Sequence, residues 1–103
     1  MISRHWRGLA KSDRAAEYEQ HLRSETFPKL RQIKGFLGGE ILKRTLQNGV
    51  EFLVISRWES VDAITQFAGP DVEAAVVPPK AQAMMVEFDE RARHYEFADF
   101  KGR

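Results

Sequence analysis

The chain has 103 residues, and 16 Lys and Arg against 15 Asp and Glu give a formal net charge of +1 at pH 7. Domains are typically about 100–150 residues long, so we expect one domain over 1–103, and the balanced charge argues against a nucleic-acid-binding protein. The absence of cysteine excludes disulfides, thiolate chemistry, iron–sulfur clusters and cysteine-ligated zinc, and it fits a cytoplasmic protein.

The first predicted element is a strand over residues 2–8, where apolar and polar side chains alternate in the segment ISRHWRG. Arg4, His5 and Arg7 interrupt any apolar run there, so we expect no signal peptide. No other segment approaches the ~18 apolar residues of a membrane-spanning helix, so we expect no membrane partner.

A long helix is predicted next. Ser12 and Asp13 are typical helix-starting residues, because their side chains accept hydrogen bonds from free backbone N–H groups. Pro28 lies inside the helical pattern and lacks an N–H, so we expect a kink over residues 24–27, and Gly35 ends the element. The apolar positions that recur at spacings of three and four are Ala15, Tyr18, Leu22, Thr26, Leu30 and Ile33.

Residues 36–58 are predicted to form a β-hairpin around Asn48-Gly49, the residue pair that a type I′ turn favours. A two-residue loop at that position sets the register of the two strands, and a shift by one residue would exchange their faces. The expected pairs are Gln47 with Val50, Arg44 with Leu53, Leu42 with Ile55, Glu40 with Arg57, and Gly39 with Trp58.

The C-terminal half is predicted to contain a helix capped by Ser60 and ended by Gly69-Pro70, then short helical pieces to about Val77 and over residues 80–86. A strand over residues 91–100 closes the chain. The order βαββαβ predicts an α+β, ferredoxin-like fold, with a four-stranded antiparallel sheet and both helices on one face.

The second face of this sheet leads to a prediction about assembly. Two helices cover one face only, so residues such as Leu42, Leu46, Leu53 and Ile55 would remain in water on the other. A large exposed apolar patch usually marks an interface. We therefore expect a homodimer with sheets packed face to face, a dimeric α/β barrel.

These segments together resemble the antibiotic biosynthesis monooxygenase (ABM) family of small dimeric α+β barrel proteins. The resemblance covers nearly the whole chain and rests on ISRHWRG, KGFLGGEILKR, EFLVISRWES, AITQFAGPDVEAAVVPP and FDERARHYEF. It implies a dimer of ferredoxin-like protomers, each with a small-molecule pocket between its sheet and helices, and it does not imply one reaction.

Members of this family with known activity divide into cofactor-free monooxygenases acting on polycyclic phenols or anthrones, and haem-degrading enzymes. The haem degraders use a histidine as iron ligand after the WES-like segment, with a tryptophan before it. By spacing from Trp58, these positions are Val77 and Phe67 here, so the resemblance disfavours haem degradation. We expect no cofactor, and we include Phe67 among the substrate-binding candidates.

A cofactor-free oxygenase needs a general base near neutral pH to ionise its substrate, with donors for the resulting oxyanion. His94 and His5 are the candidates, because they lie on strands that this fold makes neighbours. Each could instead be a hydrogen-bonded histidine of the sheet. His21 is interpreted as an exposed or rim residue of the first helix.

Three aromatic residues, Trp58, Trp6 and Tyr95, are candidate walls for a flat ligand, although core packing explains them equally. Arg4 shares a strand face with Trp6 and is a candidate anchor for an anionic substrate group, or the partner of a nearby carboxylate. No spacing of His, Asp and Glu suggests a metal site. The hypotheses are therefore a cofactor-independent monooxygenase-like enzyme for a small aromatic or polyketide-like molecule, and a non-catalytic ligand-binding homodimer.

Overall fold

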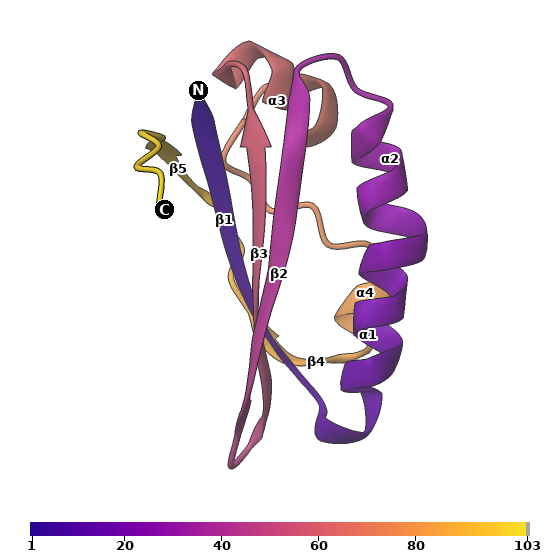
Figure 1. The fold of residues 1–103 in the computed structure, drawn as a ribbon. Coiled ribbons are helices and arrows are strands. Elements are labelled where there is room, and N and C mark those ends of the chain that lie inside the picture. Colours follow the sequence, from indigo (N-terminus) through magenta and orange to yellow (C-terminus); the bar gives the residue numbers. More distant parts are fainter. Residues whose placement is uncertain (103) are drawn as a thin grey trace.

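The computed structural model describes residues 1–102 as an antiparallel sheet with helices along one face (Figure 1). This arrangement confirms the α+β, ferredoxin-like prediction. No helix in this part of the chain is long and apolar enough to cross a membrane. The elements in chain order are β1 (Ile2–Ala10), η1 (Ser12–Arg14), α1 (Ala15–His21), η2 (Leu22–Thr26), α2 (Phe27–Arg31), β2 (Phe36–Leu46), β3 (Gly49–Trp58), α3 (Val61–Ala68), α4 (Pro79–Gln82), β4 (Met85–Phe88) and β5 (Arg93–Glu96).

The sheet has the strand order β2-β3-β1, and β4 and β5 both pair with the remaining edge of β1. The single last strand predicted over residues 91–100 is therefore wrong in extent, because two short strands occupy this edge and the sheet has five strands. Residues 90–92, between β4 and β5, form hydrogen bonds with residues 73–75 and not with β1. The Ala75 N–H donates to the Glu90 carbonyl, and the Ala92 N–H donates to the Glu73 carbonyl. The sheet of the single chain remains open.

The predicted short helices of the C-terminal half need correction. The segment 69–78 contains no helix, and the residues predicted as a helix over 80–86 divide between the four-residue α4 and strand β4. Pairing with β1 explains the second difference, since Met85 and Phe88 lie opposite Ala10 and Gly8. Backbone hydrogen bonds to a neighbouring strand override a weak local preference for helix.

The first helix loses its regular α-helical pattern close to the kink that Pro28 led us to expect over residues 24–27. Residues 22–26 form a π-helical turn, η2, between two α-helical segments. Pro28 cannot donate a hydrogen bond to the Ser24 carbonyl, so the regular pattern fails one turn earlier. The Ser60 cap is also confirmed, because its Oγ accepts a hydrogen bond from the Ala63 N–H at 3.2 Å.

The hairpin register is shifted by two residues from the prediction. Its loop is Gln47–Asn48, and Leu42 pairs with Leu53 instead of Ile55. Gly49 already belongs to β3, at φ 155°, where a Cβ would lie 2.5 Å from the Ala10 carbonyl oxygen. Close approach to the end of β1 therefore requires this glycine, and no type I′ turn forms. A two-residue shift keeps the predicted faces, because side chains alternate with period two.

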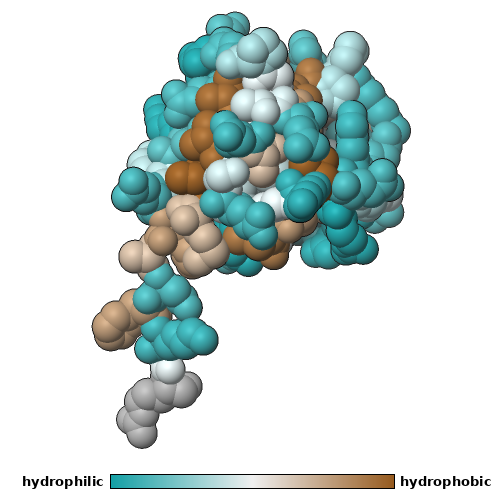
Figure 2. Space-filling model, turned by 90° about the horizontal axis from the view of Figure 1, so that it is seen from above, coloured by the Kyte–Doolittle hydropathy of each residue, from teal (hydrophilic) through white to brown (hydrophobic). Residues whose placement is uncertain are grey.

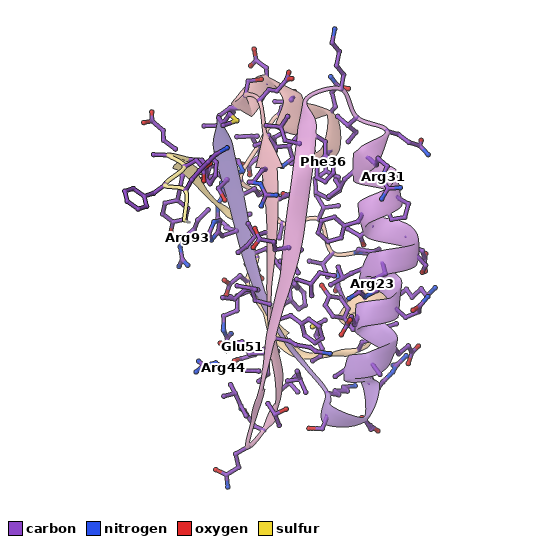
Figure 3. All side chains as sticks on the ribbon, viewed as in Figure 1. Arg23, Arg31, Phe36, Arg44, Glu51 and Arg93 are labelled. Atoms are coloured by element: carbon purple, nitrogen blue, oxygen red, sulfur yellow. The ribbon has the colours of Figure 1, made fainter. Side chains whose placement is uncertain are left out.

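The core fills the layer between the inner face of the sheet and the helices, as Figure 3 shows for Phe36, which lies between β2 and α2. Trp58 and Phe52 of β3 are fully buried, and they pack with Leu30 and Leu22 of the long helical segment, respectively. Ion pairs occupy part of the opposite face. One joins Arg57 to Glu40, as predicted, although the two residues are diagonal neighbours in the observed register and not directly opposed. The long helical segment and the sheet therefore enclose one layer of side chains.

Gly39 is predicted to be essential to this layer. A Cβ there would lie 2.4 Å from Cε1 of Phe27 and 2.5 Å from the Ile55 carbonyl oxygen. We expect Gly39→Ala to lower the free energy of unfolding by about 1–3 kcal/mol, because the helix must move outward. Urea denaturation measures this, with Gly102→Ala as the control, since nothing lies within 4 Å of a Cβ there. Equal stability of the two variants would contradict the prediction.

Candidate functional site

A cavity lies between the inner face of the sheet and the helices. Its enclosed part has a volume of about 60 Å³, which holds only a few water molecules. A wider surface hollow, called the mouth here, adjoins it. Six residues line both: His21, Thr26, Phe67, Val76, Val77 and Pro78. A ligand with more than a few atoms has to occupy the mouth as well.

The walls of the cavity are mainly apolar. Trp6 and Val54 come from the sheet, and Leu22 and Leu30 come from the long helical segment. The polar side chains on the walls are those of Arg4, Tyr18, His21, Thr26 and Ser56. A mostly apolar cleft with few polar groups is typical of small-molecule sites.

The Tyr18 hydroxyl is not a candidate base. Tyr18 is 3% exposed, and burial raises the pKa of its phenol above the ordinary value. The phenol therefore stays neutral at physiological pH.

Arg4 is buried, with 5% of its surface exposed, and its guanidinium holds the irregular segment 69–78 against the sheet. Its Nη1 donates to the Val72 carbonyl at 2.6 Å, and its Nη2 donates to the Ala74 carbonyl at 2.8 Å. The guanidinium carbon lies 5.7 Å from the centre of the Phe67 ring. Burial lowers the pKa of Arg4 to about 10, so it remains charged at neutral pH.

His94 lies behind Arg4. Arg4 Nη1 donates to His94 Nε2 at 2.8 Å, so this nitrogen must be unprotonated. Burial, followed by the charge of Arg4, lowers the pKa of His94 below the ordinary histidine value. His94 thus supports the guanidinium, and it is not among the residues that line the cavity.

The structure places the predicted site residues in three regions. Arg4, Trp6 and Phe67 line the cavity. Trp58 is fully buried in the adjoining core, where its indole N–H donates to the Ser56 hydroxyl at 2.8 Å. The remaining two aromatic or imidazole candidates, His5 and Tyr95, lie on the other side of the sheet.

On that outer face, His5 and Tyr95 contact each other edge to face at 5.1 Å. His5 Nε2 is 2.8 Å from the Ser3 hydroxyl, and burial lowers the pKa of His5. Both residues line a shallow surface hollow that also includes Glu40 and Arg57. The sheet therefore separates His5 from the cavity.

His21 is the cavity residue that sequence reasoning missed. It was expected to be exposed or at a rim, but it is 6% exposed and stacks on the Tyr18 ring at 6.1 Å. One signal was available: His21 lies three residues after the apolar-stripe residue Tyr18 and four before Glu25, so all three share one helix face.

The model of the family described as antibiotic biosynthesis monooxygenase matches residues 1–77. The chain therefore belongs to the antibiotic biosynthesis monooxygenase family, which confirms the resemblance. No curated protein matches the chain at a significant level.

Solved structures agree on the fold. One, from Deinococcus radiodurans, is titled a "putative antibiotic biosynthesis monooxygenase"; it is 22% identical, with a TM-score of 0.68 over 100% of this chain and 98% of its own. Another is the "heme-degrader" MhuD of Mycobacterium tuberculosis with two haems in its active site. It is 18% identical, with a TM-score of 0.67 over 99% of this chain and 100% of its own. At these identities the likeness shows the fold alone.

Acid pH is expected to destabilise the protein through His94. Its folded pKa lies below 6.5, so below that pH the unfolded chain binds more protons than the folded chain. The free energy of unfolding should therefore fall as pH drops from about 7.5 to 5.

A series of urea denaturations across this range measures the slope. His94→Gln keeps an acceptor for Arg4 but cannot titrate, so its slope should be shallower than that of the wild type; His5, whose pKa is also lowered, should supply the remaining slope. The same slope in both proteins would contradict this role of His94.

Proposed function

We propose that this protein is a cofactor-independent monooxygenase-like enzyme for a small aromatic or polyketide-like molecule, which binds in the cavity and its mouth. Membership of the family supports an oxygenase, and the cavity lining supports a flat, largely apolar substrate. The observation that carries the proposal is the combination of aromatic walls, Trp6 and Phe67, with the cationic Arg4 at one small site.

The proposed reaction needs only the substrate and O₂. An anthrone or related phenol loses a proton to form an electron-rich anion, which transfers electrons to O₂. In an anthrone, one oxygen atom replaces the two hydrogens of the reacting carbon as a carbonyl. In a phenol, the two hydrogens lost are that of the reacting ring carbon and that of the hydroxyl, and the product is a quinone. In both cases the second oxygen atom leaves with the two hydrogens as water. The guanidinium of Arg4 stabilises the anion electrostatically in a site of low dielectric constant.

Haem is not proposed as a cofactor. Val77 and Phe67, the positions that correspond by spacing to the histidine and tryptophan of haem degraders, both line the cavity. Neither side chain can ligate iron.

We also propose that the outer face of the sheet binds a second copy of the chain. Leu42 and Leu53 pair across β2 and β3 there, with 46% and 37% of their surfaces exposed. Glu51 joins this apolar area to Arg7 and Arg44 through ion pairs of 2.6 Å each, and Figure 3 shows Arg44 and Glu51 on the side away from the helices. An apolar centre with charges of both signs around it suits a two-fold symmetric contact.

The tail formed by residues 97–102, after β5, adds apolar surface beside this face. It projects from the body of the molecule in Figure 2, and Phe100 is 96% exposed. In a dimer the tail would have a partner surface to pack against.

Oxygen uptake with a panel of anthrones and polycyclic phenols tests the enzyme. Thr26 lies where the cavity meets its mouth, so Thr26→Trp should block entry and reduce turnover by about tenfold or more. Ser24→Trp is the matched control, because Ser24 is an exposed residue of the same π-helical turn. Wild-type protein that binds these compounds without consuming O₂ would favour the non-catalytic ligand-binding hypothesis instead.

Analytical ultracentrifugation over a dilution series tests the dimer. Leu53→Arg should weaken association by about tenfold or more, because it places a charge in the apolar centre of the contact. Val61→Arg is the control, since Val61 is similarly exposed, at 39%, on α3. A folded wild type that sediments as a monomer at all concentrations would overturn the proposal.

A further inference from the structure

The imidazole of His21 occupies a position that a base acting in the cavity requires. It comes from the last residue of α1 and lines both the enclosed cavity and its mouth. The stacked Tyr18 ring supports one side of it. His21 therefore lies at the boundary between the mouth and the cavity.

A carboxylate sets the orientation of this imidazole. His21 Nδ1 lies 3.3 Å from Oε2 of Glu25, and Lys80 Nζ of the α4 segment lies 2.7 Å from the same oxygen. The hydrogen bond from Lys80, followed by that from His21, holds the pKa of Glu25 below its ordinary value. An ionised carboxylate can only accept hydrogen bonds, so Nδ1 carries the proton of the neutral imidazole.

The other nitrogen, Nε2, is consequently the basic one, and the protein leaves it free. Nε2 makes no hydrogen bond to any described residue. Yet residues 1–102 contain no buried side-chain nitrogen or oxygen without a hydrogen-bond partner. Nε2 is therefore reached by solvent, and the cavity and mouth are the open spaces that His21 borders.

The other two histidines do not offer this combination. Nε2 of His94 accepts a hydrogen bond from Arg4, and Nε2 of His5 is hydrogen-bonded to Ser3 on the outer face. Of the three histidines in the sequence, His21 alone lines the cavity, and its Nε2 has no hydrogen bond to a described residue.

We propose that His21 is the general base that ionises a phenolic or enolic substrate in this cavity, and that Glu25 is its positioning residue. The inference rests on the proposed function and names the residue that begins its reaction. The substrate O–H bond breaks, its proton forms the Nε2–H bond, and the electron pair remains on the substrate oxygen. Glu25 stabilises the imidazolium, and Arg4 on the cavity wall stabilises the phenolate.

Binding of p-nitrophenol, whose ionised form absorbs at a longer wavelength, tests this step without turnover. We expect wild-type protein to raise the ionised fraction of the bound phenol above that of the free phenol at the same pH. His21→Gln should abolish this increase while the circular dichroism spectrum is unchanged. Failure of the wild type to bind the phenol, or binding of its neutral form, would overturn the proposal, as would a folded His21→Gln protein that still ionises it.

Glu25 has a separate test, because it is exposed and its replacement should leave the fold intact. The amide of Glu25→Gln can donate to Nδ1, which favours the tautomer with the proton on Nε2 and removes the basic lone pair. Nitrogen-15 NMR of the imidazole should show this change of tautomer, together with loss of phenol ionisation. Glu17→Gln is the matched control, since Glu17 on α1 pairs with Arg14 of η1 and does not line the cavity or its mouth.

Oxygen uptake separates the two proposals. If the wild type oxidises an anthrone, His21→Gln should reduce kcat/KM by roughly 100-fold to 10,000-fold. Unchanged uptake in that variant would overturn the base and leave the oxygenase. No uptake by the wild type, combined with phenol ionisation that depends on His21, would overturn the oxygenase and leave the base.

Discussion

The buried guanidinium of Arg4 is the interaction on which the cavity depends. The segment 69–78 has no helix or strand and must still satisfy its backbone groups against the rest of the fold. Arg4 donates hydrogen bonds to two carbonyls of this segment, those of Val72 and Ala74. Residues 90–92 form hydrogen bonds with the Ala75 N–H and the Glu73 carbonyl. Because Val76 and Val77 of this segment wall the cavity, a charge buried in the sheet also shapes the site. Such a charge is tolerated when good acceptors surround it, and His94 is a third one.

Pro28 has a comparable influence on the opposite wall. By removing one hydrogen bond it introduces the π-helical turn, and that turn carries Leu22 and Thr26 onto the cavity. π-helical turns occur frequently at functional sites. The long helical segment therefore presents His21 and Thr26 to the sheet across a local irregularity instead of a regular α-helical face.

The sheet divides the molecule into two environments with different tasks. Its inner face contributes Arg4 and Trp6 to a narrow, mostly apolar cavity. Its outer face presents Leu42 and Leu53 among ion pairs, and no helix of residues 1–102 covers that face (Figure 1). Alternation along β1 alone separates these tasks, since neighbouring residues point to opposite faces. The proposed ligand binding and the proposed association with a second copy therefore use opposite faces of the sheet and do not compete for residues.

Local patterns in the sequence were sufficient for the order of elements as far as α3, the ferredoxin-like class, the Ser60 cap and the break near Pro28. Each depends on interactions within a few residues of chain, such as a cap or a missing N–H. The predicted hairpin register was wrong by two residues. Gly49 is needed for close approach to the Ala10 carbonyl of β1, and it is not part of the hairpin turn. The division of the last strand likewise depends on hydrogen bonds between residues 73–75 and 90–92, which no local pattern reveals.

The same distinction holds for the site. Alternation along the first strand identified Arg4 and Trp6 as candidates, because it determines which face of the sheet a side chain occupies. The family resemblance added Phe67, and all three residues line the cavity. Only the tertiary structure decided which histidine meets them. His21 lies beside Val76, Val77 and Pro78 of segment 69–78. The Nε2 atom of His94 is hydrogen-bonded because Arg4 of β1 donates to it. Both are contacts between residues far apart in the chain, so the environment of each imidazole is fixed by packing and not by its neighbours in sequence.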